Sequence, residues 1–483
     1  MGMRVIVAVV SKGGENAVPA VVTALRTLQA EKGSCFALAT SKAHVEESDL
    51  ERLLGYYDHS MAAVGCAWSQ GSPRGKHEFI KQENAALVFE GKIYSPIGVA
   101  VSDLVAEETP QDCSKLAERL LKKVEGDFAL LATEPERITA ARDLIGVQPL
   151  YYGENRDVAA LASNRKTLWT LGVEETKCFP PGHVGIITKE GFKFQPVKAL
   201  AFAEPKPIGM QKAAAKLQKL LETSVRRRVQ GEKEVAVAFS GGLDSSVVAF
   251  FAKKCGANVS LIHVSLENQP ETEAAQKAAI ELDLPLCAYL FKEADVEAVV
   301  PRVVELVEEP DPVKVSIGVP FYFAAQKTKE AGFRVLLAGQ GADELFGGYQ
   351  RYVNEYVLSG DEQVRKTMFH DVVNIHESNV ERDEKICGFH DVELRLPFAQ
   401  MQLAEFALSL PTKLKFEKNP DSLRKLVLRK AAKNMGLSAQ ITGRPKKAVQ
   451  YSTGTSNALK RIAKKRKLTV AEYIEELFQE QRN

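Results

Sequence analysis

Short apolar runs separated by turn residues fill the chain up to about residue 200. Runs rich in β-branched and apolar residues predict strands, and apolar residues at helical spacing predict helices near residues 17–31 and 114–124. The clearest predicted strands cover residues 5–10, 85–89, 129–133, 158–161 and 184–188. This part of the chain therefore predicts an α+β domain that contains much sheet.

The pattern changes after Pro205-Lys206-Pro207, which we interpret as a linker because proline favours extended backbone. A predicted helix over residues 210–228 comes next, and strands then alternate with helices. The predicted strands cover residues 234–239, 259–264, 286–290 and 335–338, with helices at 245–255 and 271–282. Such alternation predicts βαβ units in a parallel sheet, and a largely helical pattern follows from about residue 361. We expect two domains, 1–204 and 208–483.

The composition is that of an ordinary globular protein, with 45% hydrophobic and 26% charged residues. Lys and Arg total 64 and Asp and Glu total 62, a near balance that argues against a dedicated nucleic-acid-binding protein. We interpret the basic stretch at residues 460–467 as a solvated helix face, with nucleic-acid contact as the less favoured alternative.

Targeting signals and disulfides are also not expected. The first apolar run, residues 5–10, is too short for a signal peptide or a membrane span. The seven cysteines lie far apart, without the spacing of a disulfide framework or a zinc site. We therefore expect a cytoplasmic protein with reduced thiols and no membrane partner.

A glycine-rich segment, Phe239-Ser240-Gly241-Gly242-Leu243-Asp244-Ser245-Ser246, lies between a predicted strand and an apolar helix. Its glycines allow the backbone to approach a phosphate, and the helix N-terminus directs free N–H groups at an anion. Its serines add hydroxyl donors, and Asp244 could hold Mg²⁺ against a polyphosphate. The segment lacks the G-x-x-x-x-G-K-[ST] pattern of the common NTPase loop. An ordinary capped helix start is the alternative.

A second acidic, glycine-rich segment follows another predicted strand. It reads Gly339-Gln340-Gly341-Ala342-Asp343-Glu344-Leu345-Phe346-Gly347-Gly348-Tyr349. Loops at the carboxyl ends of parallel strands lie at one edge of the sheet, so Asp244 and Asp343 are expected to face each other across a Mg²⁺–pyrophosphate group. For Asp343 the alternative is a simple acidic helix start.

These segments resemble known families. The Ser-Gly-Gly-Leu-Asp-Ser loop resembles the pyrophosphate-binding loop of the N-type ATP pyrophosphatases. The second segment and later landmarks, over about residues 211–456, look like the synthetase domain of asparagine synthetase. Those landmarks are residues 392–398, 406–411, 428–431 and 444–447. The first domain is similar to a class II glutamine amidotransferase domain at residues 87–94, 126–129, 141–152 and 180–183.

The resemblance implies a fold and a reaction. The fold would be an α+β Ntn-hydrolase-like sandwich followed by an α/β parallel-sheet ATP pyrophosphatase domain with a helical C-terminal part. The enzyme would be a carbon–nitrogen ligase that activates a carboxylate with ATP as an acyl-adenylate, releases pyrophosphate, and forms an amide as AMP leaves. Aspartate would become asparagine, with ATP and Mg²⁺ as cofactors.

The resemblance also assigns roles to residues. Asp244 and Asp343 match the Mg²⁺ ligands, and Lys446 matches a lysine that neutralises charge developing during transfer. We assign Lys446, Gln340 and Asp343 as catalytic. The assigned nucleotide-binding residues are Ala238, Ser240, Gly241, Gly242, Asp244, Ser245, Ser246, Val264, Gly339 and Gly341. An exposed basic cluster is the alternative for Lys446, and a structural ion pair is the favoured interpretation of Glu393 and Arg395.

The amidotransferase-like domain departs from its family at three places. Removal of Met1 would expose Gly2, where that family uses an N-terminal cysteine as nucleophile. The Asn-Gly of the oxyanion hole is replaced by Glu90-Gly91, and the Arg-Gly-Pro-Asp segment that helps to bind glutamine is not found. We therefore expect no glutaminase activity, with ammonia as the direct nitrogen donor unless a partner supplies it.

The synthetase-like domain departs at Gln340, where the family has glutamate, and at Gln400, where it has aspartate. An amide can orient a substrate by hydrogen bonding but cannot take up a proton. Two alternatives therefore stand beside asparagine synthesis: adenylation of another carboxylate, and a non-catalytic ATP-binding regulatory subunit. A homodimer would fit the family, and small molecules are the expected substrates.

Overall fold

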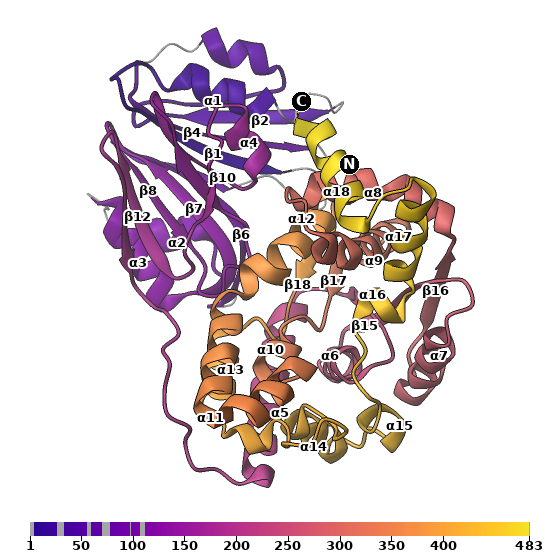
Figure 1. Ribbon diagram of the computed structural model, residues 1–483. Coiled ribbons are helices and arrows are strands. Elements are labelled where there is room, and N and C mark those ends of the chain that lie inside the picture. Colours follow the sequence, from indigo (N-terminus) through magenta and orange to yellow (C-terminus); the bar gives the residue numbers. More distant parts are fainter. Residues whose placement is uncertain are drawn as a thin grey trace. The chain divides into compact units, whose positions relative to one another are not determined.

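The computed structural model describes residues 4–26, 33–55, 59–69, 78–96, 98–106 and 112–482 (Figure 1). The chain forms two compact units. The first comprises residues 1–199 with 388–391, and the second comprises residues 200–387 with 392–483.

The first unit contains two antiparallel sheets within the described residues. The first sheet has the strand order β11-β9-β10-β1-β4-β2-β3 and the second has the order β13-β12-β8-β7-β6-β5. The strands of the first are β1 (Val5–Ser11), β2 (Ser34–Ala39), β3 (His44–Glu47), β4 (Ala62–Ser69), β9 (Tyr151–Glu154), β10 (Val158–Ala162) and β11 (Lys177–Cys178). Those of the second are β5 (Glu78–Lys81), β6 (Ala86–Ser95), β7 (Glu125–Thr133), β8 (Ile138–Arg142), β12 (His183–Thr188) and β13 (Gly191–Pro196).

The alternation of side chains along β1 explains how these layers pack. Val5, Val7 and Val9 share a core cluster with helix α1 (Val18–Leu25), because successive strand residues point to opposite faces. Ile6, Ala8 and Val10 instead join residues of the second sheet, such as those of β6 and β7, in the cluster between the sheets. Helices α2 (Val101–Ala106) and α3 (Cys113–Lys123) lie beside the second sheet, and α4 (Arg165–Trp169) lies beside the first (Figure 1). The unit is an α+β sandwich, as the sequence predicts.

The strands predicted in this unit are all present, with ends that shift by a few residues. The helix expected at residues 17–31 is confirmed as α1 over Val18–Leu25, and its positions 27–31 lie outside the described residues. Strand β4 was not predicted because it is rich in alanine and has Val64 as its single β-branched residue.

The second unit is built on a parallel sheet with the order β16-β15-β14-β17-β18. Its strands are β14 (Glu234–Ala238), β15 (Asn258–Leu266), β16 (Leu286–Phe291), β17 (Val335–Leu337) and β18 (Glu393–Arg395). The order reverses between β14 and β17, which are adjacent and parallel. Parallel sheets bind ligands at such a reversal, outside the carboxyl ends of the strands. Both glycine-rich loops emerge at this point.

Helices surround this sheet. They are α5 (Met210–Val229), α6 (Leu243–Lys254), α7 (Glu271–Leu282), α8 (Glu293–Val307), α9 (Pro312–Glu330), α10 (Ala342–Phe346), α11 (Gln350–Val373) and α12 (Glu381–Phe389). The C-terminal part adds α13 (Met401–Leu408), α14 (Leu426–Asn434), α15 (Ala439–Thr442), α16 (Val449–Ser452), α17 (Thr455–Lys465) and α18 (Val470–Arg482). None of the helices in the described ranges combines the length and hydrophobicity needed to span a membrane.

Helix α6 and strand β18 are two of the elements that differ from the sequence-based expectation. Helix α6 begins at Leu243, two residues earlier than expected, so Asp244 lies in its first turn. Strand β18 lies in the part that was expected to be helical, and it pairs with β17. In β18, Arg395 is fully buried, and its guanidinium donates to Glu393 at 2.7 Å and to Glu232 at 2.6 Å. This is the structural ion pair that the sequence predicts, extended by a third residue.

Replacing Leu336 in the central strand β17 should lower the stability of the second unit. Leu336 is fully buried, so Leu336→Ala removes apolar contacts and leaves a cavity that costs about 2–5 kcal/mol. Leu290→Ala on the edge strand β16 is the matched control, because Leu290 is 52% exposed and the change should stay within about 0.5 kcal/mol. Denaturant unfolding monitored by circular dichroism measures both variants, and equal losses would contradict this packing.

Candidate active site

The loop after β14 folds tightly onto the start of helix α6. The Ser240 hydroxyl accepts a hydrogen bond from the Gly242 N–H at 3.2 Å, and the Ser245 hydroxyl accepts one from the Ser240 N–H at 3.3 Å. Gly241 has a φ of +67°, and a Cβ there would lie 2.7 Å from the Cα of Ala275 in α7. Only glycine allows this close approach, which leaves the loop open towards the helix N-terminus.

The loop after β17 packs directly against the first loop. A Cβ at Gly339 would lie 2.9 Å from the Cβ of Asp244. A Cβ at Gly348 would overlap both Asp343 Oδ1 and Lys425 Cε. These two glycines therefore allow the acidic side chains and Lys425 to come together.

An ionic cluster occupies the point where the loops meet. Lys425 Nζ lies 2.6 Å from Asp244 Oδ2 and 2.7 Å from Asp343 Oδ1, and Lys446 Nζ lies 2.7 Å from Asp343 Oδ2. Burial alone would raise the pKa of Asp343, but Lys425 and Lys446 outweigh burial and hold this pKa well below its usual range. Burial likewise opposes the charge of Lys446, yet Asp343 and Asp244 raise its pKa. Asp343 and Lys446 are thus both held in their charged forms.

A strongly basic hollow of about 510 Å³ opens beside the cluster. Its lining includes Asp244 and the first glycine-rich loop, together with five cationic side chains. These are Lys425, Arg429, Arg444, Lys446 and Lys447. The excess of positive charge beside the N-terminus of helix α6 suits a polyphosphate.

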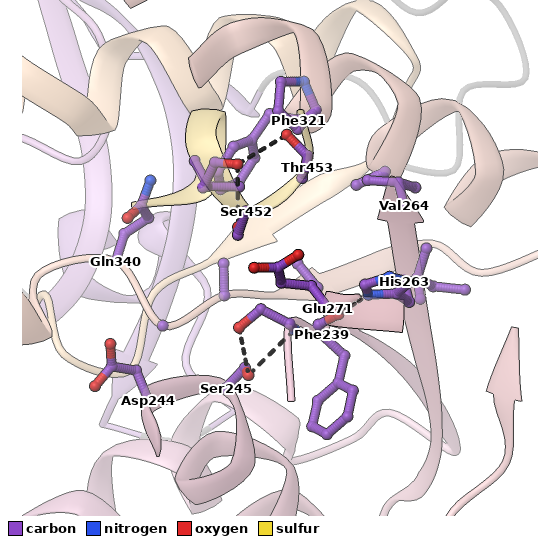
Figure 2. Close-up of a pocket in the computed structure, with 18 of the residues that line it drawn as sticks. Phe239, Asp244, Ser245, His263, Val264, Glu271, Phe321, Gln340, Ser452 and Thr453 are labelled. Carbon is purple, nitrogen blue, oxygen red and sulfur yellow. Dashed lines mark hydrogen bonds between the residues drawn. The ribbon is translucent and has the colours of Figure 1, made fainter. Parts of the chain in front are cut away.

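A larger pocket of about 880 Å³ adjoins this hollow, and the two share Ser240, Asp244, Lys446, Lys447 and Ser452. Figure 2 shows that Val264 and Gln340 lie on opposite sides of this pocket. Apolar side chains form much of its wall: Ile262, Val264, Pro320, Phe321, Ala324 and Val449. A pocket of this volume, apolar in one part and charged at one end, matches the usual dimensions of a small-molecule site.

Most of the assigned site residues come together here. Those that line the larger pocket are Ala238, Ser240, Asp244, Ser245, Val264, Gly339, Gln340, Asp343 and Lys446, and Gly242 lines the basic hollow. The other three lie elsewhere. Gly241 packs against α7, Gly341 is the N-cap of α10 with a φ of +94°, and Ser246 is fully buried within α6.

Three side chains of the site were not found from the sequence. Lys425 directly precedes helix α14. It lies 181 positions from Asp244 in the sequence, and folding brings the two side chains into contact. Glu271, at the start of α7, places a buried carboxylate in the pocket beside Lys447 (Figure 2). Asp383 in α12 accepts a hydrogen bond from Gln340 Nε2 at 2.6 Å. Lys425 directly precedes an amphipathic helix, and this position was the one local signal available for it.

Comparison with known proteins places the chain in a family. The asparagine synthase family matches residues 216–360 and 353–482, and a glutamine amidotransferase domain family matches residues 67–170. A putative asparagine synthetase [glutamine-hydrolyzing] 1 of Methanocaldococcus jannaschii is 32% identical, over 72% of this chain and 73% of its own length. The asparagine synthetase [glutamine-hydrolyzing] of Sandersonia aurantiaca is 28% identical, over 67% of this chain and 64% of its own length. The chain belongs to the asparagine synthase family, whose members use ATP.

Proposed function

We propose that the protein is an ATP-dependent ligase that converts aspartate to asparagine, releases AMP and pyrophosphate, and takes ammonia directly. The observation that carries this proposal is the cluster of Asp244, Asp343, Lys425 and Lys446 at the point where the strand order reverses. It places two carboxylates and an excess of cations where parallel sheets bind their ligands.

The pocket and the basic hollow suggest how ATP would lie. The loop of Ser240 and Gly242 and the cations around it would bind the β- and γ-phosphates, and the apolar wall near Val264 would receive the adenine. The α-phosphate would then lie between them, near Lys446. This arrangement exposes the α-phosphorus to a carboxylate bound in the same pocket.

Two chemical steps follow from this placement. A carboxylate oxygen of the acceptor attacks the α-phosphorus, and the bond to the pyrophosphate oxygen breaks with its electron pair. Lys446 stabilises the negative charge that develops on the phosphates. The nitrogen of ammonia then attacks the acyl carbon of the adenylate, AMP leaves with the electron pair of the C–O bond, and one proton leaves the nitrogen.

The two carboxylates also fit a divalent cation. Asp244 Oδ1 is buried and has no hydrogen-bond partner among the described residues, so it is available as a metal ligand. Asp244 and Asp343 would hold Mg²⁺, which when bound would neutralise part of the charge of the pyrophosphate. Lys425 and Lys446 touch these same carboxylates and would meet the phosphates in the same region.

The first unit supports direct use of ammonia. Glu90, in the position of the family's oxyanion-hole amide, is buried, and its carboxylate lies 3.8 Å from Arg4 Nε. A carboxylate there repels the oxyanion that glutamine hydrolysis would create. Burial raises the pKa of the neighbouring Cys66 well above its usual value, so this thiol is a poor nucleophile.

A second candidate function is adenylation and amidation of another carboxylate. Gln340 favours it, because this residue lines the pocket and offers a neutral amide where the family has a carboxylate. Gln400 lies at the N-cap of α13 and is buried, so it bears on the acceptor less directly. The mass of the amide product distinguishes the two candidates.

Removing the Lys446 ammonium should impair the reaction without unfolding the protein. Lys446→Ala should lower kcat/KM for aspartate- and ammonia-dependent AMP release by about 10²–10³-fold, because one transition-state cation is lost. Lys464→Ala on the exposed face of α17 is the matched control and should retain wild-type rates. Pyrophosphate and AMP release are measured together, and an unchanged rate in Lys446→Ala would contradict the assigned role.

Glutamine should not replace ammonia. With ATP and aspartate, ammonium should support AMP release, whereas glutamine should yield no glutamate above a heat-denatured control, because Glu90 opposes the oxyanion. Glutamate is measured by an enzyme-coupled assay. Glutamate release by the native chain would show that the first unit hydrolyses glutamine.

A further inference from the structure

The side chain of Gln340 forms a hydrogen bond with a buried carboxylate, that of Asp383, which does not line the pocket. Its Nε2 donates a hydrogen bond of 2.6 Å to Asp383 Oδ2, across 43 positions of sequence. Asp383 is fully buried, and Arg382 Nε donates to its other oxygen at 2.8 Å. Both carboxylate oxygens of Asp383 therefore have a fixed donor.

This arrangement determines which way the Gln340 amide points. An ionised carboxylate only accepts hydrogen bonds, so the amide group must turn its NH₂ to Asp383. Burial raises the pKa of Asp383, and the Arg382 guanidinium and the Gln340 amide oppose that rise by favouring the ionised form. Gln340 Oε1 accepts no hydrogen bond from any described residue, and this oxygen is not fully buried. This oxygen is therefore left as an accessible acceptor on a residue that lines the pocket.

The contact also explains why position 340 carries an amide. A glutamate there would place its carboxylate at hydrogen-bond distance from that of Asp383. Arg382 would then supply one positive charge against two negative charges. Two carboxylates so close cannot both stay ionised, and one would have to take up a proton. Glutamine gives Asp383 the donor it needs and keeps an acceptor for the pocket.

We propose that Asp383 is a positioning residue that orients the Gln340 amide, so that Gln340 Oε1 accepts a hydrogen bond from the nitrogen nucleophile and aims its lone pair at the acyl carbon. This inference rests on the proposed function. As the C–N bond forms, the C–O bond to AMP breaks and AMP takes the electron pair. A carboxamide is too weak a base to take the released proton, which passes to the phosphate of AMP or to water.

A reciprocal pair of substitutions tests the orientation. In Asp383→Asn, the new side-chain oxygen stays with Arg382 and the new NH₂ faces residue 340, so the Gln340 amide must reverse and present a donor to the nucleophile. In Gln340→Glu, two carboxylates oppose each other. In the double variant, the carboxylate introduced at position 340 accepts from the amide introduced at position 383 and again offers an oxygen to the pocket.

Each single variant should raise KM for ammonium or lower kcat, so that kcat/KM for ammonium falls about tenfold, which corresponds to about 1.4 kcal/mol. KM for ATP should stay within about twofold of the wild-type value. The double variant should recover to within about threefold of the wild-type kcat/KM for ammonium. Gln363→Glu and Asp421→Asn, at exposed positions, are the matched controls and should change neither constant. Single variants with unchanged ammonium kinetics, or a double variant no better than the worse single one, would overturn the inference.

Thermal unfolding of the wild type, the two single variants and the double variant tests the pairing without turnover. Gln340→Glu should lower Tm, and adding Asp383→Asn should recover most of the loss. Absence of amidation by the wild type would contradict the proposed function alone, because the unfolding cycle still decides the pairing. Equal Tm values for wild type and Gln340→Glu would overturn the pairing even if the enzyme turns over.

Discussion

The buried ammonium of Lys425 is the group on which the site depends. It lies within 2.7 Å of a carboxylate oxygen on each acidic loop, and only 2% of its side chain is exposed. Asp244 and Asp343 would otherwise face each other as buried like charges, which is costly without a compensating cation. Gly339 and Gly348 serve the same contact, because any side chain at either position would push the loops or Lys425 apart. The first glycine-rich loop, Asp244, Asp343 and Lys446 are thereby kept within one small volume.

The parallel sheet determines where that volume lies. Both loops leave adjacent strands, β14 and β17, at the reversal of strand order, so their charged residues must meet at the same edge. Lys446 and Lys425 then reach this edge from the C-terminal part of the chain. The two units divide the chemistry in the proposed function. There the second unit would supply adenylation and amide formation, and Glu90 in the first unit would oppose glutamine hydrolysis.

Much of this arrangement could be predicted from the sequence, and what was missed has a physical cause. The period of apolar residues predicted β1, β14, β15 and α7, and the two loops were recognisable because their glycines and acidic residues form compact local motifs. Strand β18 was missed because three residues carry too little periodicity to stand out. Lys425 and Asp383 were missed because their roles arise from contacts across 181 and 43 positions, which no local pattern records. Ser246 belongs to the predicted loop motif, yet the helix turns its side chain away from both pockets into the core.

In the proposed function, the carboxylate is activated as an acyl-adenylate in the pocket beside Lys446. Isotope transfer is the decisive test of this activation, because formation and breakdown of an acyl-adenylate must leave one carboxylate oxygen on AMP. The enzyme is incubated with ATP, Mg²⁺, ammonium and aspartate labelled with ¹⁸O in its side-chain carboxylate, and the products are analysed by mass spectrometry. We expect asparagine together with AMP that carries a single ¹⁸O atom. Asparagine formed with unlabelled AMP, or with the label in inorganic phosphate and ADP as the nucleotide product, would contradict it.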